Sequence, residues 1–203
     1  MTPFVDVAFL ILSFFIMATK FKPPAPVEIT TPNSVSTEKL PDNDAVLVEV
    51  DKEGRVFFTM LAENKPEEKR KIIENLNTTR NLGLGPKEIN NFMKTVSIGV
   101  PFTGLKSLLA VDPTEQAKLR QPGIPIKDSA SNELVFWIRD AVSAFAGTKL
   151  NYMIKADNAA KYPAFKEVLG AFKRNDIYKF QLVTSPEDAP VGTDLYKERS
   201  GIK

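Results

Sequence analysis

The chain of 203 residues contains no cysteine and no histidine. Without cysteine it can form no disulfide framework and offers no thiolate nucleophile. Without histidine it lacks the usual general base, the commonest transition-metal ligand and the Ser-His-Asp arrangement. These absences argue against most hydrolases, and we expect a protein that is not an enzyme, with no catalytic residues, no metal site and no cofactor.

An excess of charge of either sign is also lacking, since 27 Lys and Arg residues balance 25 Asp and Glu residues. No block of like charge is long enough to predict a nucleic-acid surface or a peripheral lipid surface, so we expect no nucleic-acid partner. Apolar residues make up 43% of the chain and charged residues 26%. Both fractions are close to globular averages, so composition alone indicates an ordinary folded domain.

One segment departs from this average, a run of apolar residues at the start of the chain. Between Pro3 and Lys20 the run contains a single charged residue, Asp6. A helix over residues 1–21 would be about 31 Å long, close to the thickness of a bilayer core. Lys20 and Lys22 can reach the headgroups, and the prolines that follow end the helix. We therefore predict a transmembrane helix over residues 1–21.

Two other interpretations of this run remain open. A secretory signal peptide would carry basic residues before the apolar run, whereas here the lysines follow it. A buried core helix can be apolar on all sides, but it needs a larger domain around it than this chain provides. The run also begins without the charged flank that usually fixes orientation, which favours a cytoplasmic stretch missing from this sequence.

Asp6 is the candidate functional residue of the predicted helix. A carboxylate at the centre of a membrane helix costs roughly 2.5 to 3.5 kcal/mol on insertion scales, and it usually faces protein or a water-filled path. Ser13 shares its helical face and is a candidate for extending a proton path. The alternative is that Asp6 lies at the membrane interface and only caps the helix N-terminus.

The rest of the chain divides into a linker, a domain and a tail. Residues 22–43 are rich in Pro, Ser, Thr and Asn, which predicts a flexible linker. Inside it, residues 27–31 alternate apolar and polar side chains and stop at Pro32, as a short edge strand does. Residues 44–187 form the predicted domain, and residues 188–203 a C-terminal tail.

Within the domain the predicted order of elements is β-β-α-β-α-β, an α+β fold. Residues 45–59 form a hairpin around an Asp-Lys-Glu-Gly turn. Trp137 is expected in the core or in an interface, and Lys155 and Asp157 are expected to solvate and cap a turn without chemistry. Periodicity and turn residues predict the elements that follow, which are helix 132–146, strand 150–155, helix 162–175 and strand 178–184.

A long insertion, residues 60–131, separates the hairpin from the first helix of this pattern. Turns that contain Gly and Pro divide it into segments with helical periodicity. We predict a largely helical insertion, and interpret it as a lid or a surface for partner contact. Its predicted helices are 67–76, 86–96 and 113–121.

Three features of the sequence resemble the ExbD/TolR family. The first nine residues after Met1, T-P-F-V-D-V-A-F-L, look like the T-P-[MF]-[VI]-D-[VL] signature that opens the membrane helix of that family. The order of elements within residues 44–187 resembles the family's periplasmic domain, apart from the insertion. The third feature is similar to the V-x-[VI]-x-x-P strand that follows the membrane helix, with Thr31 where the family has leucine, and consists of Val27, Glu28, Ile29, Thr30, Thr31 and Pro32.

The resemblance implies a function, partners and a location. In the family the aspartate of the signature conducts protons, and here it falls on Asp6; residues 27–32 correspond to the partner strand. The chain would be a single-pass subunit of a motor in the bacterial inner membrane, with its N-terminus cytoplasmic and its domain periplasmic. A dimer of this chain would sit inside a pentamer of ExbB/TolQ-like multi-pass subunits. The motor would act on a TonB-like protein, a TolA-like protein or the cell wall, and the sequence leaves open which.

A second function remains open, that of a membrane-tethered binding module for a protein or for peptidoglycan. Asp6 would then be an assembly contact only, and replacing it with Asn would leave energised transport intact. A tethered enzyme is disfavoured because the sequence offers no histidine, thiol, metal cluster or nucleophile elbow.

Overall fold

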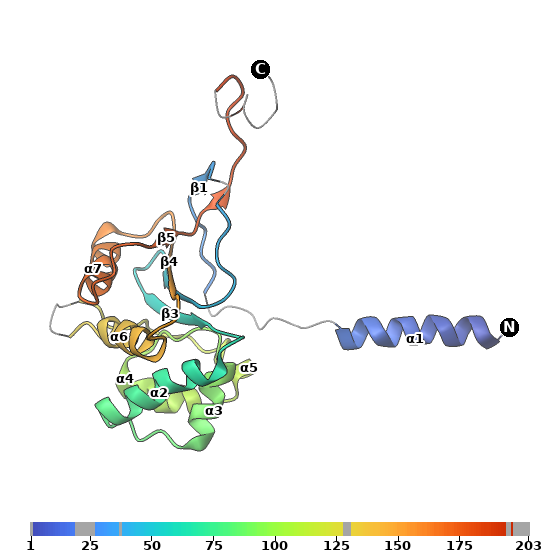
Figure 1. The fold of residues 1–203 in the computed structure, drawn as a ribbon, viewed down its shortest axis with the longest axis horizontal. Helices are drawn as coiled ribbons and strands as arrows, with labels where there is room; N and C mark the ends of the chain where they lie inside the picture. Colours follow the sequence, from blue (N-terminus) through green and yellow to red (C-terminus); the bar gives the residue numbers. More distant parts are fainter. Residues whose placement is uncertain (1, 19–26, 37, 128–130, 194–195, 197–203) are drawn as a thin grey trace.

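The computed structural model describes residues 2–18, 27–36, 38–127, 131–193 and 196 (Figure 1). Parts of the predicted segments therefore lie outside the described residues, namely 1 and 19–21 of the transmembrane helix, 22–26 and 37 of the linker, 128–130 of the insertion, and 194–195 and 197–203 of the tail. The described residues comprise an N-terminal helix, α1 (Thr2–Ala18), and a mixed α and β domain.

A four-stranded sheet forms the centre of the domain. Its spatial order is β3 (Val56–Leu61), β2 (Ala45–Val50), β4 (Asn151–Ala156) and β5 (Gln181–Leu182). The pair β2 and β3 is antiparallel, which confirms the predicted hairpin, while β4 runs parallel to β2 and β5 parallel to β4. The chain enters β3 through Gly54, which has a φ of +80° that favours glycine in the turn.

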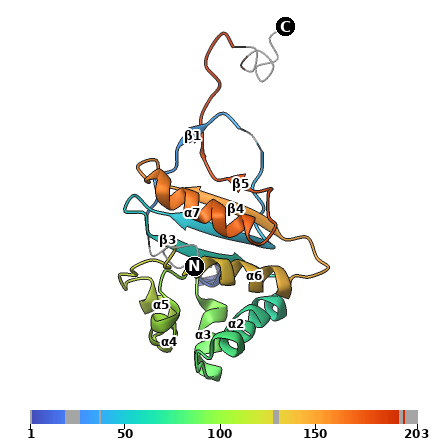
Figure 2. The same ribbon diagram turned by 90° about the vertical axis from the view of Figure 1, so that its left-hand side faces the viewer.

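Two helices cover one face of this sheet, as Figure 2 shows. They are α6 (Leu134–Ala144) and α7 (Tyr162–Lys173), and they confirm the two helices predicted at these places. The register places Val48, Phe58 and Ile154 side by side, and all three belong to the main hydrophobic core. The domain thus has the predicted β-β-α-β-α-β order, and its core lies between the sheet and the helices.

The last strand is shorter than the prediction of residues 178–184. β5 comprises Gln181–Leu182, and the chain then leaves the sheet to form β6 (Ser185–Pro186). β6 pairs in parallel with β1 (Asn33–Ser34), a strand of the N-terminal segment. A local pattern could not place this break, because it depends on a partner about 150 residues earlier in the chain.

The insertion is largely helical, as predicted, but its helices differ in extent. α2 (Pro66–Arg80) continues beyond the predicted end, and α3 (Pro86–Lys94) lies close to prediction. The sequence analysis missed α4 (Phe102–Ala110), whose apolar spacing is interrupted by Gly104. α5 (Pro113–Gln116) ends early, and the chain then turns to bury Gln121, whose Oε1 accepts a hydrogen bond of 2.6 Å from the Gly99 N–H.

Packing favours a role of the insertion in the core over the interpretation of it as a lid. Trp137 of α6 is fully buried, and its ring stacks on Phe58 of the sheet with centroids 5.0 Å apart. The same indole contacts Phe92 of α3 and Phe102 of α4, at 6.1 Å and 5.9 Å. Because one aromatic cluster joins the sheet, α6 and the insertion, opening the insertion would expose the core itself.

The insertion also covers one edge of the sheet. Ile98 forms a bridge with Phe58 of β3, with backbone hydrogen bonds of 2.8 Å and 2.9 Å in the two directions. The Ile124 N–H donates to the Val56 carbonyl at 2.8 Å. Close approach is possible because residue 99 is glycine, since a Cβ there would lie 2.1 Å from the ring of Phe57. The edge at β3 is therefore closed, and β5 forms the other edge of the sheet.

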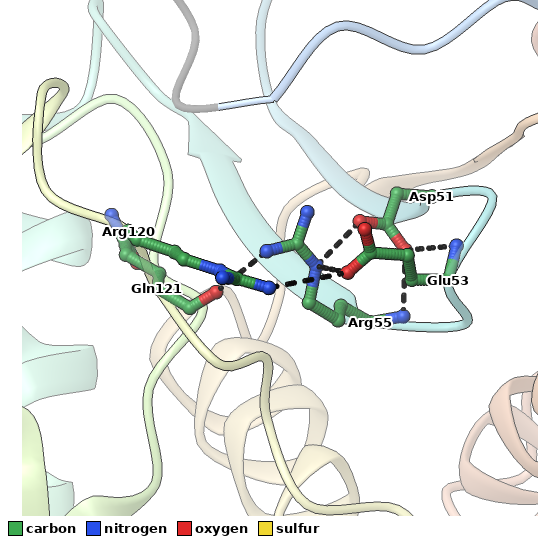
Figure 3. A network of polar contacts seen from close by, with 5 residues as sticks. All are labelled: Asp51, Glu53, Arg55, Arg120 and Gln121. Carbon is green, nitrogen blue, oxygen red and sulfur yellow. Dashed lines mark hydrogen bonds and ion pairs between the residues drawn. The ribbon is translucent and has the colours of Figure 1, made fainter.

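A polar network fastens the hairpin turn to the insertion (Figure 3). The carboxylate of Asp51 is almost completely buried and accepts hydrogen bonds from the backbone N–H groups of Glu53 and Arg55, at 2.9 Å and 2.8 Å. It also accepts from Arg55 Nε at 2.6 Å, while Arg55 Nη1 donates to the carbonyl of Gln121 at 3.3 Å. Arg120 completes the network with a 3.8 Å contact to Glu53. These contacts link the hairpin turn to the end of the insertion.

Candidate functional site

The predicted functional residue, Asp6, lies on α1. It is the single charged residue in the helix, and its side chain is exposed. The helix starts at Thr2 and has no acidic residue in its first turn. Asp6 therefore lies beyond the N-cap position, which argues against the interpretation that it only caps the helix.

The apolar side chains around Asp6 are exposed on every side of α1. Their exposed fractions range from 53% for Ile11 to 87% for Met17. Ser13 is half-buried and lies seven residues after Asp6, on the same face of the helix. The two side chains are therefore separated by about 10 Å along the axis. A proton path from Asp6 through Ser13 would need water or another protein between them.

Among the described residues, no helix combines the length and the apolarity that crossing a membrane requires. α1 comprises 17 of the 21 residues predicted for the transmembrane helix, and the other four, 1 and 19–21, lie outside the described residues. At 1.5 Å per residue it measures about 26 Å.

The second candidate site, residues 27–32, is not the strand that the sequence predicts. Its side chains alternate between half-buried and exposed, so the predicted period of two is present, but the strand of this region is β1 at Asn33–Ser34. The segment cannot form a continuous ladder because the Thr30 N–H is bound by the side chain of Asp157, at 3.0 Å, and Pro32 has no N–H to donate.

This segment is nevertheless held on the domain. The Thr30 carbonyl accepts from the Asn158 N–H at 2.8 Å, and the Pro32 carbonyl accepts from the Ser185 N–H at 3.0 Å. The hydroxyls of Thr31 and Ser185 lie 2.6 Å apart. Within the predicted flexible linker, the part from 27 to 36 is therefore attached to the domain by hydrogen bonds.

Asp157 and Lys155, expected to have no chemistry, have structural partners. Hydrogen bonds from the backbone N–H groups of Ala159 and then Thr30 lower the pKa of the Asp157 carboxyl. Lys155 Nζ lies 3.3 Å from Glu49 Oε1 across neighbouring strands. In the described part of the chain, no group of three or more acidic, Cys or His side chains is arranged to hold a metal ion.

A groove that the sequence analysis missed lies beside the open edge of the sheet. Its volume is about 890 Å³, and it separates the segment after β1 from β5 and the residues around it. Gln181 Nε2 donates to Glu38 Oε1 across it at 3.0 Å, and Leu182 at the edge is 52% exposed. The lining residues are Ser34, Ser36, Glu38, Lys39, Leu40, Asp42, Phe180, Gln181, Leu182, Thr184 and Pro186.

An edge strand offers unpaired backbone groups to which another strand can add, and β5 is the edge that the insertion leaves open. No local motif could have predicted the groove, because its two walls come from residues 34–42 and 180–186.

Comparison with known families gives one match. The family model described as "Biopolymer transport protein ExbD/TolR" matches residues 1–187. Comparison with curated proteins and comparison with solved structures gave no match. The family match includes α1 with Asp6, the docked segment and the whole domain up to β6, and it spans the insertion. The chain therefore belongs to the ExbD/TolR family and is a subunit of a biopolymer-transport motor.

Proposed function

We propose that this chain is the proton-conducting subunit of an ExbB-ExbD/TolQ-TolR-type motor, and that Asp6 carries the proton. The observation that carries the proposal is Asp6 itself, the one ionisable side chain of a helix whose other exposed side chains are almost all apolar. A carboxylate in such a setting usually serves ion or proton movement. The position of Asp6 beyond the first helical turn supports this role over that of a cap.

The proposed location is the bacterial inner membrane. Residues 1–21 would cross it once, with the N-terminus cytoplasmic and the domain periplasmic. The exposed apolar surface of α1 supports this placement, because water is a poor solvent for a helix that is apolar all round. In a membrane, Lys20 and Lys22 would reach the headgroups at the periplasmic end.

Partners are part of the proposal, since a lone helix cannot shield a carboxylate from lipid. An ExbB/TolQ-like multi-pass subunit would supply the protein surface or the water path that Asp6 faces, with a pentamer surrounding a dimer of this chain. Protonation would change the preference of Asp6 between the wet path and the apolar wall. Alternation between the two states would rotate or rock the helix and convert the proton gradient into work.

The domain would pass this work to a periplasmic partner. A TonB-like protein, a TolA-like protein or the cell wall fits the proposal, for transport across the outer membrane or for its maintenance. Residues 27–32 lie between α1 and the domain along the chain. A movement of the helix would therefore reach them before it reaches the rest of the domain. Their docking by a few hydrogen bonds to residues 157, 158 and 185 supports a role as the partner strand, because little has to break to release them.

The proposal is tested by replacing Asp6 with Asn in the full chain. The variant and the native chain are each reconstituted with the ExbB/TolQ-like subunit in liposomes that contain a pH-sensitive dye. We expect proton flux to fall to the background of liposomes with the multi-pass subunit alone, because Asn cannot take up a proton. Co-purification with that subunit should be unchanged, and Asp6→Glu should retain part of the flux.

The alternative function, a membrane-tethered binding module for a protein or for peptidoglycan without proton conduction, makes the opposite prediction. If Asp6→Asn leaves both proton flux and energised transport at the native level, Asp6 is an assembly contact and the motor role is wrong. The groove beside β5 is the feature that favours this alternative, since it would serve a binding module equally well.

A further inference from the structure

The two edges of the central sheet are covered to different degrees. At β3, backbone hydrogen bonds of Ile98 and Ile124 continue the sheet into the insertion. At β5, no further strand pairs with the edge among the residues that the structure describes. The wall of the groove opposite β5 is formed largely by residues 38–42, a short segment between β1 and β2. We call residues 38–42 the strap.

Contacts on both sides of the strap fix its position. Before it, β1 pairs in parallel with β6, which follows β5 directly along the chain. After it, Asp44 forms an ion pair of 2.9 Å with Lys65, and the chain enters β2 in the middle of the sheet. The strap itself contacts the edge strand, because Glu38 Oε1 accepts a hydrogen bond from Gln181 Nε2 at 3.0 Å. The strap is therefore held beside β5.

The sequence at this edge favours pairing with a copy of itself. Residues 180–184, F-Q-L-V-T, contain no charged residue, no proline and no glycine. Short segments of low charge and high β-propensity are those that pair edge to edge when they lie at an open edge. Leu182, in the middle of the segment, is 52% exposed. Two identical edges can pair about a twofold axis, so a second copy of the chain is the partner that this edge fits.

The strap contains the residue types that oppose such pairing. Glu38, Lys39 and Asp42 are charged and exposed, and Pro41 has no N–H to donate to a ladder. Charged side chains, proline and covering loops are the means by which natural sheets avoid association at their edges. A second copy that approached β5 through the groove would meet these charges and would have to separate Glu38 from Gln181.

We infer that the strap shields β5 from edge-to-edge pairing with a second copy of the chain. No backbone hydrogen bond joins the described residues 38–42 to β5, so the shielding comes from the charges of the strap and from its position beside the edge. The domain thus protects its two edges by different means, by backbone pairing at β3 and by a charged loop at β5. The inference is independent of Asp6, and a dimer formed through α1 is compatible with it.

The test removes the three charges of the strap from the full chain, in the variant Glu38→Ala/Lys39→Ala/Asp42→Ala. All three side chains are exposed, so the core keeps its packing. Sedimentation velocity in a density-matched non-ionic detergent, over a range of protein concentrations, measures self-association. We expect the variant to associate at concentrations about tenfold lower than the native chain, because charges that oppose pairing are gone. Adding Leu182→Lys to this variant should restore the native behaviour, because it places a charge on the edge itself.

The matched control is Glu67→Ala/Lys71→Ala/Glu74→Ala, which removes the same charges from three exposed positions of α2. It should sediment as the native chain does. Equal association of the control would show a general loss of charge repulsion and overturn the inference. The inference is also wrong if the strap variant sediments as the native chain does. If Leu182→Lys leaves the association of the strap variant unchanged, the contact lies away from β5, and the inference is wrong as well.

Discussion

The N-terminal helix and the helices of the insertion differ in the exposure of their apolar side chains. On α1, eleven large apolar side chains are more than half exposed. In α2, α3 and α4 the corresponding side chains, such as Ile72, Phe92 and Leu105, are buried in the same core as the sheet. The domain therefore supplies its own apolar environment, whereas α1 must obtain one from outside the chain.

The difference in exposure indicates different roles for the insertion and for α1. The insertion is part of the domain's stability, so a movement of the domain moves the insertion with it. α1 has no such constraint from the core, and its one carboxylate can respond to its surroundings without disturbing the fold. The proposed function uses this combination, because in it a helix that changes its contacts would transmit force to a domain with its own core.

The largest expected effect tests whether the sheet and the insertion share one core. Replacing Trp137 with Ala should lower the free energy of unfolding by about 3 to 5 kcal/mol, because the indole joins Phe58, Phe92 and Phe102. Urea unfolding of the full chain in detergent, followed by far-UV circular dichroism, measures this change. The domain should still unfold in one transition.

The comparison between the regions supplies the control for this variant. Ile11→Ala on α1 removes a smaller apolar group from an exposed position and should leave the urea midpoint of the domain unchanged. If Trp137→Ala instead produces two separate transitions, one for the insertion and one for the sheet, the two do not form a single unit.

Much of the fold could be predicted because its signals are local. The hairpin at β2 and β3 follows from two β-rich runs around a Gly turn, and α6 and α7 follow from apolar spacing of helical period. The prediction failed where distant residues decide the structure. The strand expected over 27–31 lies instead at Asn33–Ser34, because the Asp157 side chain occupies the Thr30 N–H and β1 pairs with β6.

The features of the candidate sites were likewise predicted only in part. Asp6 stands out from sequence because a single charge in an apolar run needs no tertiary information. The groove beside β5 could not be identified from sequence, since it joins segments some 140 residues apart. The helix α4 was missed because Gly104 and Pro101 resemble turn residues.

A smaller effect is expected where the hairpin is fastened to the insertion. Replacing Asp51 with Ala removes a buried carboxylate that accepts from the N–H groups of Glu53 and Arg55 and from the Arg55 guanidinium. We expect a loss of about 2 to 4 kcal/mol in the free energy of unfolding, because these donors lose their acceptor. Thermal unfolding of the full chain measures the loss.

Glu53→Ala is the matched control for this change, since Glu53 lies in the same network but is half exposed. Its loss should change the stability by less than about 0.5 kcal/mol, as expected of a surface ion pair. Equal destabilisation by the two substitutions would contradict the interpretation that Asp51 is the main residue of this polar network.

The smallest effect concerns the segment that joins the two regions. Asp157 accepts hydrogen bonds from the Ala159 and Thr30 N–H groups, and these lower the pKa of its carboxyl below the ordinary value of 3.8. Because the pKa is lowered in the folded state, the contribution of this contact is complete above pH 3.8 and is lost as the pH falls through the lower, folded-state pKa. Acidification below about pH 4 should therefore loosen residues 27–32 before it unfolds the core.

Asp157→Ala should produce the same loosening at neutral pH. Hydrogen–deuterium exchange of the Thr30 amide measures it, and exchange should become faster while the amides of β2 stay protected. Asp112→Ala is the control, because that carboxylate likewise accepts from a backbone N–H, but at the start of α5. Unchanged protection of Thr30 in Asp157→Ala would mean that the contacts of this segment with Asn158 and Ser185 and the pairing of β1 with β6 hold it without Asp157.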